Sequence, residues 1–294
     1  MSGPGNGDRS KARRELRGER IDSMTPHGDE LRDRLQRLER LSQKRRRGAP
    51  VKASTLDDMD DVVGRDGVLI LERDALSLMA PSAGAAFGER LARARDSLSK
   101  DGGADQELRD LLLAPEGALF LDTETTGLGS AMVFLLGVMR VTADRVVLRQ
   151  VLARDYGEEP ALLGQWTEML RSAGMLVSFN GKSFDMPVLR DRLGLHGLTA
   201  PAEPPHVDLL HPARRRWRST LPDCRLQTLE WMVCGRRRSG DIPGEEIPAA
   251  YHRFVRTGDP SDIMSVLHHN ALDLLTLADI AAALVLPDDG LARP

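Results

Sequence analysis

Two acids at the end of an apolar segment are the first feature of this sequence that could do chemistry. Asp122 directly follows the run Ala-Leu-Phe-Leu at 118–121, and Glu124 lies two residues further along. Alternate side chains of a strand point to the same face, so the two carboxylates should project together and repel each other unless a cation joins them. Hard divalent cations such as Mg²⁺ prefer oxygen ligands, and this pair is chemically suited to hold one.

Two further acids follow along the chain. Asp185 ends the stretch Phe-Asn-Gly-Lys-Ser-Phe-Asp, after a predicted strand and at the start of a predicted helix, a place that would bring it to the same sheet edge as Asp122. Asp273 lies in a predicted C-terminal helix. An isolated aspartate on a helix is usually a solvated or capping residue, so only the four acids together indicate a metal site.

Histidines close to the last acid could serve as a general base. At about 100° per residue, His269 and Asp273 differ by roughly 40° and share a helix face, whereas His268 lies roughly 140° away. Helix geometry therefore favours His269. If the helix begins only near His269, His268 could fold back into the site, so both residues stay open.

The elements that must position these residues follow Pro115, where the domain boundary is expected, so that residues 115–288 form the main domain. The first three predicted strands can form a meander, and a short strand or turn is predicted at 207–210. Strands are predicted at 118–122, 134–142, 146–153 and 175–179, and helices at about 158–171, 183–193, 226–233 and 262–285.

The N-terminal part differs in composition. Residues 1–50 hold 14 Lys and Arg against 8 Asp and Glu, while the whole chain has a net charge of −3. This basic arm is predicted to be mostly disordered, because it has too few large apolar residues to offset the entropy of ordering; it is either a solvated tail or a tether to phosphate. Residues 51–114 predict a small appendage or linker, with a possible hairpin turning at Asp66-Gly67 and a helix at 82–100.

The residues resemble a known family. Asp122-x-Glu124, Asp185 and Asp273 are similar to the four acids of the DEDD superfamily of 3′–5′ exonucleases, and from about 119 to 285 the chain resembles the YprB-type ribonuclease-H-like domain. The narrower resemblance rests on Phe-Leu-Asp-Thr-Glu-Thr-Thr-Gly-Leu (120–128), Phe-Asn-Gly-Lys-Ser-Phe-Asp-Met-Pro (179–187), His-Val-Asp-Leu-Leu (206–210), Cys-Arg-Leu-Gln-Thr-Leu-Glu (224–230), Asp-Ile-Pro-Gly (241–244) and His-Asn (269–270).

The resemblance implies an α/β fold, a ribonuclease-H-like mixed five-stranded sheet with helices on both faces. It implies two divalent metal ions, Mg²⁺ or Mn²⁺, held by Asp122, Glu124, Asp185 and Asp273. A catalytic residue shortly before the last acid is a histidine or a tyrosine in the well-known branches, and here His269 or His268 occupies that place. The resemblance also places three residues in the pocket for the terminal nucleotide: Thr126, Leu128 and Asn180.

The sequence therefore predicts a metal-dependent 3′–5′ exonuclease that hydrolyses single-stranded nucleic acid, DNA or RNA, or a frayed 3′ end, by a two-metal mechanism. A structure-specific endonuclease with the same site and a catalytically silent nucleic-acid-binding module are the alternatives. The N-terminus lacks the apolar core of a signal peptide, no apolar run approaches the ~20 residues that span a bilayer, and the two cysteines form no disulfide framework. A cytoplasmic protein without membrane contact is expected.

Overall fold

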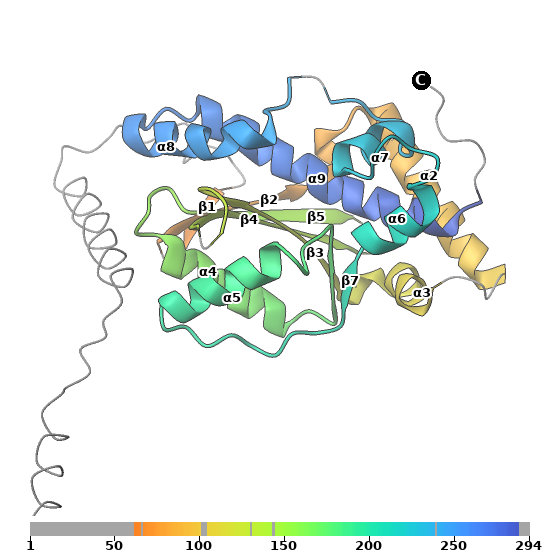
Figure 1. The fold of residues 1–294 in the computed structure, drawn as a ribbon, viewed down its shortest axis with the longest axis horizontal. Helices are drawn as coiled ribbons and strands as arrows, with labels where there is room; N and C mark the ends of the chain where they lie inside the picture. The colour runs from red at the N-terminus through yellow and green to blue at the C-terminus, as the bar shows by residue number, and fades with distance from the viewer. Residues whose placement is uncertain are drawn as a thin grey trace, which may run out of the picture. The chain divides into compact units, whose positions relative to one another are not determined.

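A mixed sheet with helices on both faces forms the centre of the structure, a computed structural model (Figure 1). The model describes residues 62–65, 67–100, 105–129, 131–142, 145–238 and 240–287, which belong to one unit of the chain. The prediction of a disordered basic arm at residues 1–50 lies outside the described residues. Of the described helices, none combines the length and the apolar character that a membrane-spanning segment requires.

The strands run in the order β1-β2-β5-β4-β3-β6-β7. The predicted meander is present as β3 (Ala118–Thr125), β4 (Val133–Val141) and β5 (Val146–Leu152), all antiparallel. β6 (Met175–Ser178) and β7 (His206–Asp208) continue the sheet beside β3 in parallel. These five strands and their helices confirm the predicted fold class.

An N-terminal hairpin makes the sheet seven-stranded, which corrects the expected number of five. β1 (Val62–Arg65) and β2 (Val68–Asp74) pair around the predicted turn, and β2 then pairs antiparallel with β5. The first four residues of β2 are buried because their side chains belong to the apolar core. By pairing with β5, the strand also satisfies backbone groups that a free sheet edge would expose. The division of the chain near residue 115 stays a prediction, although the hairpin shares its sheet with the strands that follow.

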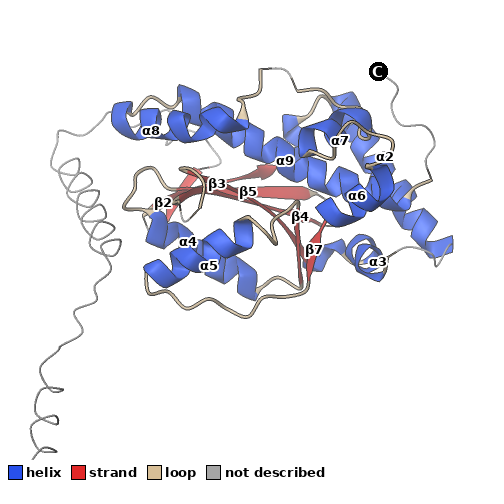
Figure 2. Cartoon of the chain, in the orientation of Figure 1, coloured by secondary structure: helices blue, strands red, loops and turns tan. Residues whose placement is uncertain are grey.

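Helices cover the two faces of the sheet (Figure 2). α4 (Glu159–Arg171) and α5 (Asp185–Leu195) lie on one face, and α8 (Ile247–Thr257) and α9 (Ser261–Val285) lie on the other (Figure 1). Four further helices contact α9: α2 (Pro81–Lys100), α3 (Gln106–Leu113), α6 (Leu210–Trp217) and α7 (Leu226–Met232). Short 3-10 helices span Ala75–Leu78, Pro115–Gly117 and Gly244–Glu246.

The alternation of side chains along β3 decides which way the acids face. Leu121 packs into the core layer that contains residues of α4 and α5, whereas Phe120 packs into the layer that contains the C-terminal half of α9. Because side chains alternate, Asp122 and Glu124 continue the row of Phe120 toward α9, and Thr123 continues the row of Leu121 toward α5.

A buried ion network attaches α5 to its neighbours. The carboxylate of Glu159 in α4 accepts hydrogen bonds from the backbone N of Val133 at 2.9 Å and from Nε of Arg192 in α5 at 2.7 Å. Nε2 of His196 lies 2.8 Å from the same carboxylate, whose side chain is only 1% exposed. A buried charge is tolerated when it is paired and fully hydrogen-bonded, so this network fixes the helix that begins with Asp185.

Candidate active site

Asp122 is held in place by an amide on α9. Nδ2 of Asn270 donates to Oδ2 of Asp122 at 2.8 Å and to its backbone oxygen at 3.2 Å, and Oδ1 of Asn270 accepts from Nε2 of Gln150 at 2.8 Å. Gly137 lies opposite Asp122 on β4, and a Cβ added there would come within 2.1 Å of Asn270. A glycine at this position is therefore required for α9 to pack close to the strand.

Asp185 reaches the same strand end from the other face of the sheet. Its Oδ1 accepts hydrogen bonds from the backbone N of Thr123 at 3.1 Å and from the hydroxyl of Thr123. Sequence alternation alone gives Thr123 no role, because its side chain points away from the acids. The structure shows that it instead orients the third acid.

The loop that precedes Asp185 is fixed by a carboxylate at the end of β7. Asp208 accepts hydrogen bonds from three backbone N–H groups, those of Asn180 at 2.7 Å, Lys182 at 3.1 Å and Leu210 at 3.1 Å. Asn180 has a φ of 64°, a left-handed conformation in which asparagine is enriched. The buried carboxylate thus stabilises a turn that places the start of α5 next to β3.

His269 and Asp273 lie together on α9, as the helix geometry predicts. Nε2 of His269 is 3.4 Å from Oδ2 of Asp273, and its Nδ1 is 3.0 Å from both carboxylate oxygens of Asp241. The side chain of His269 is 8% exposed. His268 is exposed on the helix, so the structure brings His269 and not His268 to the acids. The sequence indicates Asp241 only as the first residue of the Asp-Ile-Pro-Gly motif, and its contact with His269 is evident only in the structure.

Arg238 joins three acids around this histidine. Its guanidinium donates to Glu230 and to Asp273, and to Oδ2 of Asp241 at 3.1 Å, while its side chain is 7% exposed. Sequence reasoning missed this residue, because the run of arginines at 236–238 also fits a solvated loop. The one available signal was that Arg238 stands three residues before Asp241.

Burial, together with the charges of neighbouring acids, raises the pKa values of three of the acids. The pKa of Asp122 is well above its ordinary value because the group is buried and because other acids lie near it. Burial likewise raises the pKa of Glu124 to about 8, against the opposing charge of His269. The pKa of Asp185 is raised to about 6 by burial, although the hydrogen bonds from Thr123 favour its charged form. Each acid therefore opposes the ionisation of its neighbours.

The fourth acid and the histidine form an ion pair instead. Burial opposes the charge of Asp273, but the hydrogen bond from His269 and the charges of His269 and Arg238 hold its pKa below the ordinary value. Burial also opposes the charge of His269, yet Asp273, Glu124 and Asp241 together raise its pKa to about 9. At neutral pH this arrangement therefore keeps Asp273 ionised and His269 protonated.

The four carboxylates are suitable ligands for divalent cations, although they are not arranged as a preformed metal site. Among the described residues, no three His, Cys, Asp or Glu side chains converge as a preformed metal site. The reason is visible in the partners: Asp122 is bonded to Asn270, Asp185 to Thr123, and Asp273 to Arg238. Carboxylate oxygens are nevertheless the ligands that Mg²⁺ and Mn²⁺ prefer, so the residues fit such ions.

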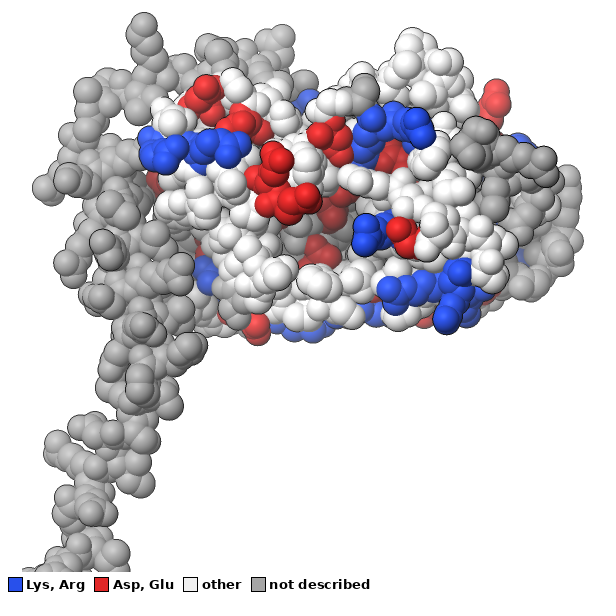
Figure 3. Space-filling model, turned by 45° about the horizontal axis from the view of Figure 1, so that its top comes forward, with Lys and Arg blue, Asp and Glu red and all other residues white. Residues whose placement is uncertain are grey.

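A pocket of about 180 Å³ opens beside Asp122 and Asp185. Leu128 lines it, and this apolar residue is 92% exposed, so it is free to contact a ligand. The other two residues expected here lie outside its lining: Thr126 donates its backbone N to Met132 at 3.0 Å, and the backbone N of Asn180 donates to Asp208. Figure 3 shows the face on the side of α8 and α9, with acidic side chains near its middle and basic ones on either side.

The comparisons with known proteins agree with this architecture. A sequence model described as RNase_H superfamily matches residues 119–285, more than half of the chain. The chain belongs to the RNase_H superfamily. This finding confirms the ribonuclease-H-like resemblance on which the predicted fold was based.

Two proteins illustrate the similarity. The chain is 40% identical over 166 residues to the "Uncharacterized protein YprB" of Bacillus subtilis (strain 168), which confirms the YprB-type resemblance; the match covers 55% of this chain and 40% of that protein. The chain therefore spans well under half of this curated relative. A family B DNA polymerase from Pyrobaculum calidifontis is 16% identical, with a TM-score of 0.46, over 56% of this chain and 24% of the polymerase.

Proposed function

We propose that this protein is a metal-dependent 3′–5′ exonuclease that acts on single-stranded nucleic acid or on frayed 3′ ends. The observation that carries the proposal is the position of Asp122 and Glu124 at the end of β3, where Asp185 accepts a hydrogen bond from the backbone N of Thr123 between them. Burial, together with neighbouring acids, raises the pKa values of all three. Such a group is poorly tolerated without a counter-charge, which divalent cations would provide.

The four acids would hold two ions in this proposal. Asn270 occupies Oδ2 of Asp122 and Thr123 occupies Oδ1 of Asp185, so each acid keeps its other oxygen for a ligand. Arg238 and His269 keep Asp273 ionised and therefore ready to bind a cation. Bound at these four acids, divalent cations would supply activation of the attacking water and stabilisation of the leaving oxygen.

His269 would be the general base. A hydrogen bond from Nδ1–H to Asp241 leaves Nε2 as the nitrogen that takes a proton from the attacking water. Burial opposes the charge of this histidine, but the carboxylates of Asp273, Glu124 and Asp241 raise its pKa to about 9. Bound cations would offset those negative charges and lower the pKa of His269 toward the working range of a base. His269 would therefore act as a base when metal is bound.

The test uses single-stranded oligonucleotides of DNA and RNA labelled at the 5′ end, together with circular single strands, in Mg²⁺, Mn²⁺ or EDTA. The proposal predicts a ladder of products shortened from the 3′ end, which requires metal and disappears in Asp122→Asn. Asp262→Asn changes a half-buried acid on the same helix as Asp273, which pairs with Arg253 and touches none of the four acids, so this matched control should keep the activity.

Two outcomes would replace the proposal by the alternatives. Cleavage of circular strands would indicate a structure-specific endonuclease that uses the same acids. Binding of the strands without cleavage of any substrate in either metal would indicate a nucleic-acid-binding module.

A further inference from the structure

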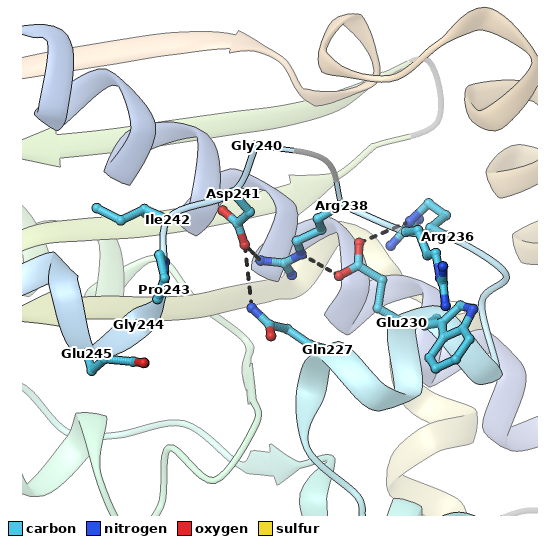
Figure 4. A pocket seen from close by; sticks show the side chains of 12 residues that line it. Gln227, Glu230, Arg236, Arg238, Gly240, Asp241, Ile242, Pro243, Gly244 and Glu245 are labelled. Carbon is cyan, nitrogen blue, oxygen red and sulfur yellow. Dashed lines mark hydrogen bonds and ion pairs between the residues drawn. The ribbon is translucent and has the colours of Figure 1, made fainter.

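A second and larger pocket adjoins the candidate active site. It has a volume of about 620 Å³, within the range of ~300–1,000 Å³ that is usual for ligand sites, and it lies between α7 and the segment from Arg236 to Glu245 (Figure 4). Gln227 and Trp231 of α7 form one side, and residues 240–245 form the other. Of the residues that line this pocket, Arg238 and Asp241 also contact the residues of the candidate active site.

Two residues that line this pocket also belong to the candidate active site. Arg238 and Asp241 line the pocket, and the same two side chains contact Asp273 and His269 respectively. The smaller pocket is lined by Asp122 and Asp185 and shares no lining residue with the larger one. Two separate pockets thus adjoin the candidate active site, an arrangement that suits a chain of linked nucleotides rather than a single small molecule.

Most charged side chains that line the larger pocket form ion pairs with one another. Figure 4 shows the ion pairs that connect Asp241, Arg238, Glu230 and Arg236 in a row. Glu245 at the rim is exposed to water, which screens its charge.

Arg237 differs from its neighbours. It is exposed, has no ion pair with an acid in the described part of the chain, and lies with its guanidinium carbon 4.1 Å from the ring centroid of Trp231. A cation stacked on an indole presents both a flat surface and a positive charge.

These are the two features that non-specific binding of a single strand uses. Bases stack on aromatic rings and on guanidinium planes, and arginine attracts the phosphodiester backbone. We propose that the pocket binds a nucleotide of the substrate strand adjacent to the one being removed, with its base stacked on the pair formed by Trp231 and Arg237. This inference rests on the proposed exonuclease function and adds a subsite that favours strands over single nucleotides.

The first test measures binding without hydrolysis. Fluorescein-labelled oligo(dT) and oligo(U) of twelve nucleotides are titrated with full-length protein in Ca²⁺, and anisotropy gives the Kd. We expect Trp231→Ala and Arg237→Ala each to weaken binding about tenfold, as loss of one stacking contact does. Trp231→Phe keeps a ring and should stay within about threefold of the wild type. Arg171→Ala, an exposed arginine at the end of α4, is the control for loss of charge.

The second test separates this subsite from the chemistry. The wild type and the variants hydrolyse the twelve-nucleotide strand and the p-nitrophenyl ester of thymidine 5′-monophosphate, which fills only one nucleotide position. The proposal predicts that the ratio of kcat/KM for the strand to that for the ester falls about tenfold in Trp231→Ala and Arg237→Ala, mainly through KM. Equal losses on both substrates, or no loss on the strand, would overturn it.

Failure of the proposed function has a different signature. If the wild type hydrolyses neither substrate but the two variants lose oligonucleotide binding in Ca²⁺, the subsite stands and the exonuclease proposal falls. If the wild type hydrolyses the strand and all variants bind it equally, the exonuclease proposal stands and the subsite falls. Absence of both binding and hydrolysis in the wild type overturns the two together.

Discussion

Replacing Glu124 by Gln should stabilise the metal-free protein at pH 8 while removing its metal-dependent activity. Glu124 has a pKa of about 8 in the folded chain against an ordinary value of 4.5. Its ionisation is therefore easier in the unfolded chain, so Glu124 destabilises the fold progressively as pH rises from 4.5 to 8, and it has no such effect below 4.5. Glutamine has nearly the same shape and carries no charge.

The magnitude follows from the shift. A difference of about 3.5 pH units between the folded and the unfolded pKa corresponds to roughly 5 kcal/mol at pH 8. The gain is smaller, because Glu124 is only partly buried and because glutamine loses the attraction of His269, so we expect about 1–3 kcal/mol. For a protein of this size that gain raises Tm by roughly 2–10 °C.

The assay is thermal unfolding in EDTA at pH 4 and at pH 8, with Glu168→Gln as the control on an exposed part of α4. The Tm of Glu124→Gln should exceed that of the wild type at pH 8, and the difference should vanish at pH 4. With Mn²⁺ at pH 8 the order should reverse, because the ion stabilises only a protein that binds it. A variant that is less stable than the wild type in EDTA at pH 8, or equally shifted at both pH values, would refute the reasoning.

Three other variants test the proposed general base and two residues that help to position the acids. His269→Gln should lower kcat by about 10²–10⁴-fold with Mn²⁺ affinity within a few-fold of the wild type, whereas His268→Gln should leave both unchanged; equal effects of the two would reject His269 as the base. Gly137→Ala should cost about 1–3 kcal/mol of unfolding free energy, because its Cβ would lie 2.1 Å from Asn270, and Gly84→Ala, with open space around it, should not destabilise. Asp208→Ala should cost about 2–4 kcal/mol by leaving three backbone N–H groups without an acceptor, and a change below 0.5 kcal/mol in chemical denaturation would contradict the role given to it.

The sequence predicts the main elements well because their signals are local. The strand that carries Asp122, the meander after it and the long helix with Asp273 all show apolar runs or helical periodicity, and the structure has them within a few residues. Helix α8 was overlooked, although Pro248 near its start and Gly258 at its end, with a φ of 76°, are ordinary helix boundaries. Helix α6 is not evident from the sequence, because its three consecutive arginines also fit a solvated loop.

What sequence patterns could not supply are the long-range contacts of the candidate site. The pairing of β2 with β5 joins residues far apart in the chain, and nothing local specifies it. The contact of Asp241 with His269 and that of Arg238 with Asp273 likewise cross between a loop and α9. Periodicity ranks His269 above His268, but only the packing of α9 against β3 shows which of them faces the acids.

The most direct test of the account is a crystal of the full chain soaked with Mn²⁺, in which anomalous scattering locates the ions. If the proposed site is right, two peaks about 3.5–4 Å apart should lie among the carboxylates of Asp122, Glu124, Asp185 and Asp273. Ions bound only elsewhere, or no peak among these four side chains at a saturating Mn²⁺ concentration, would contradict it.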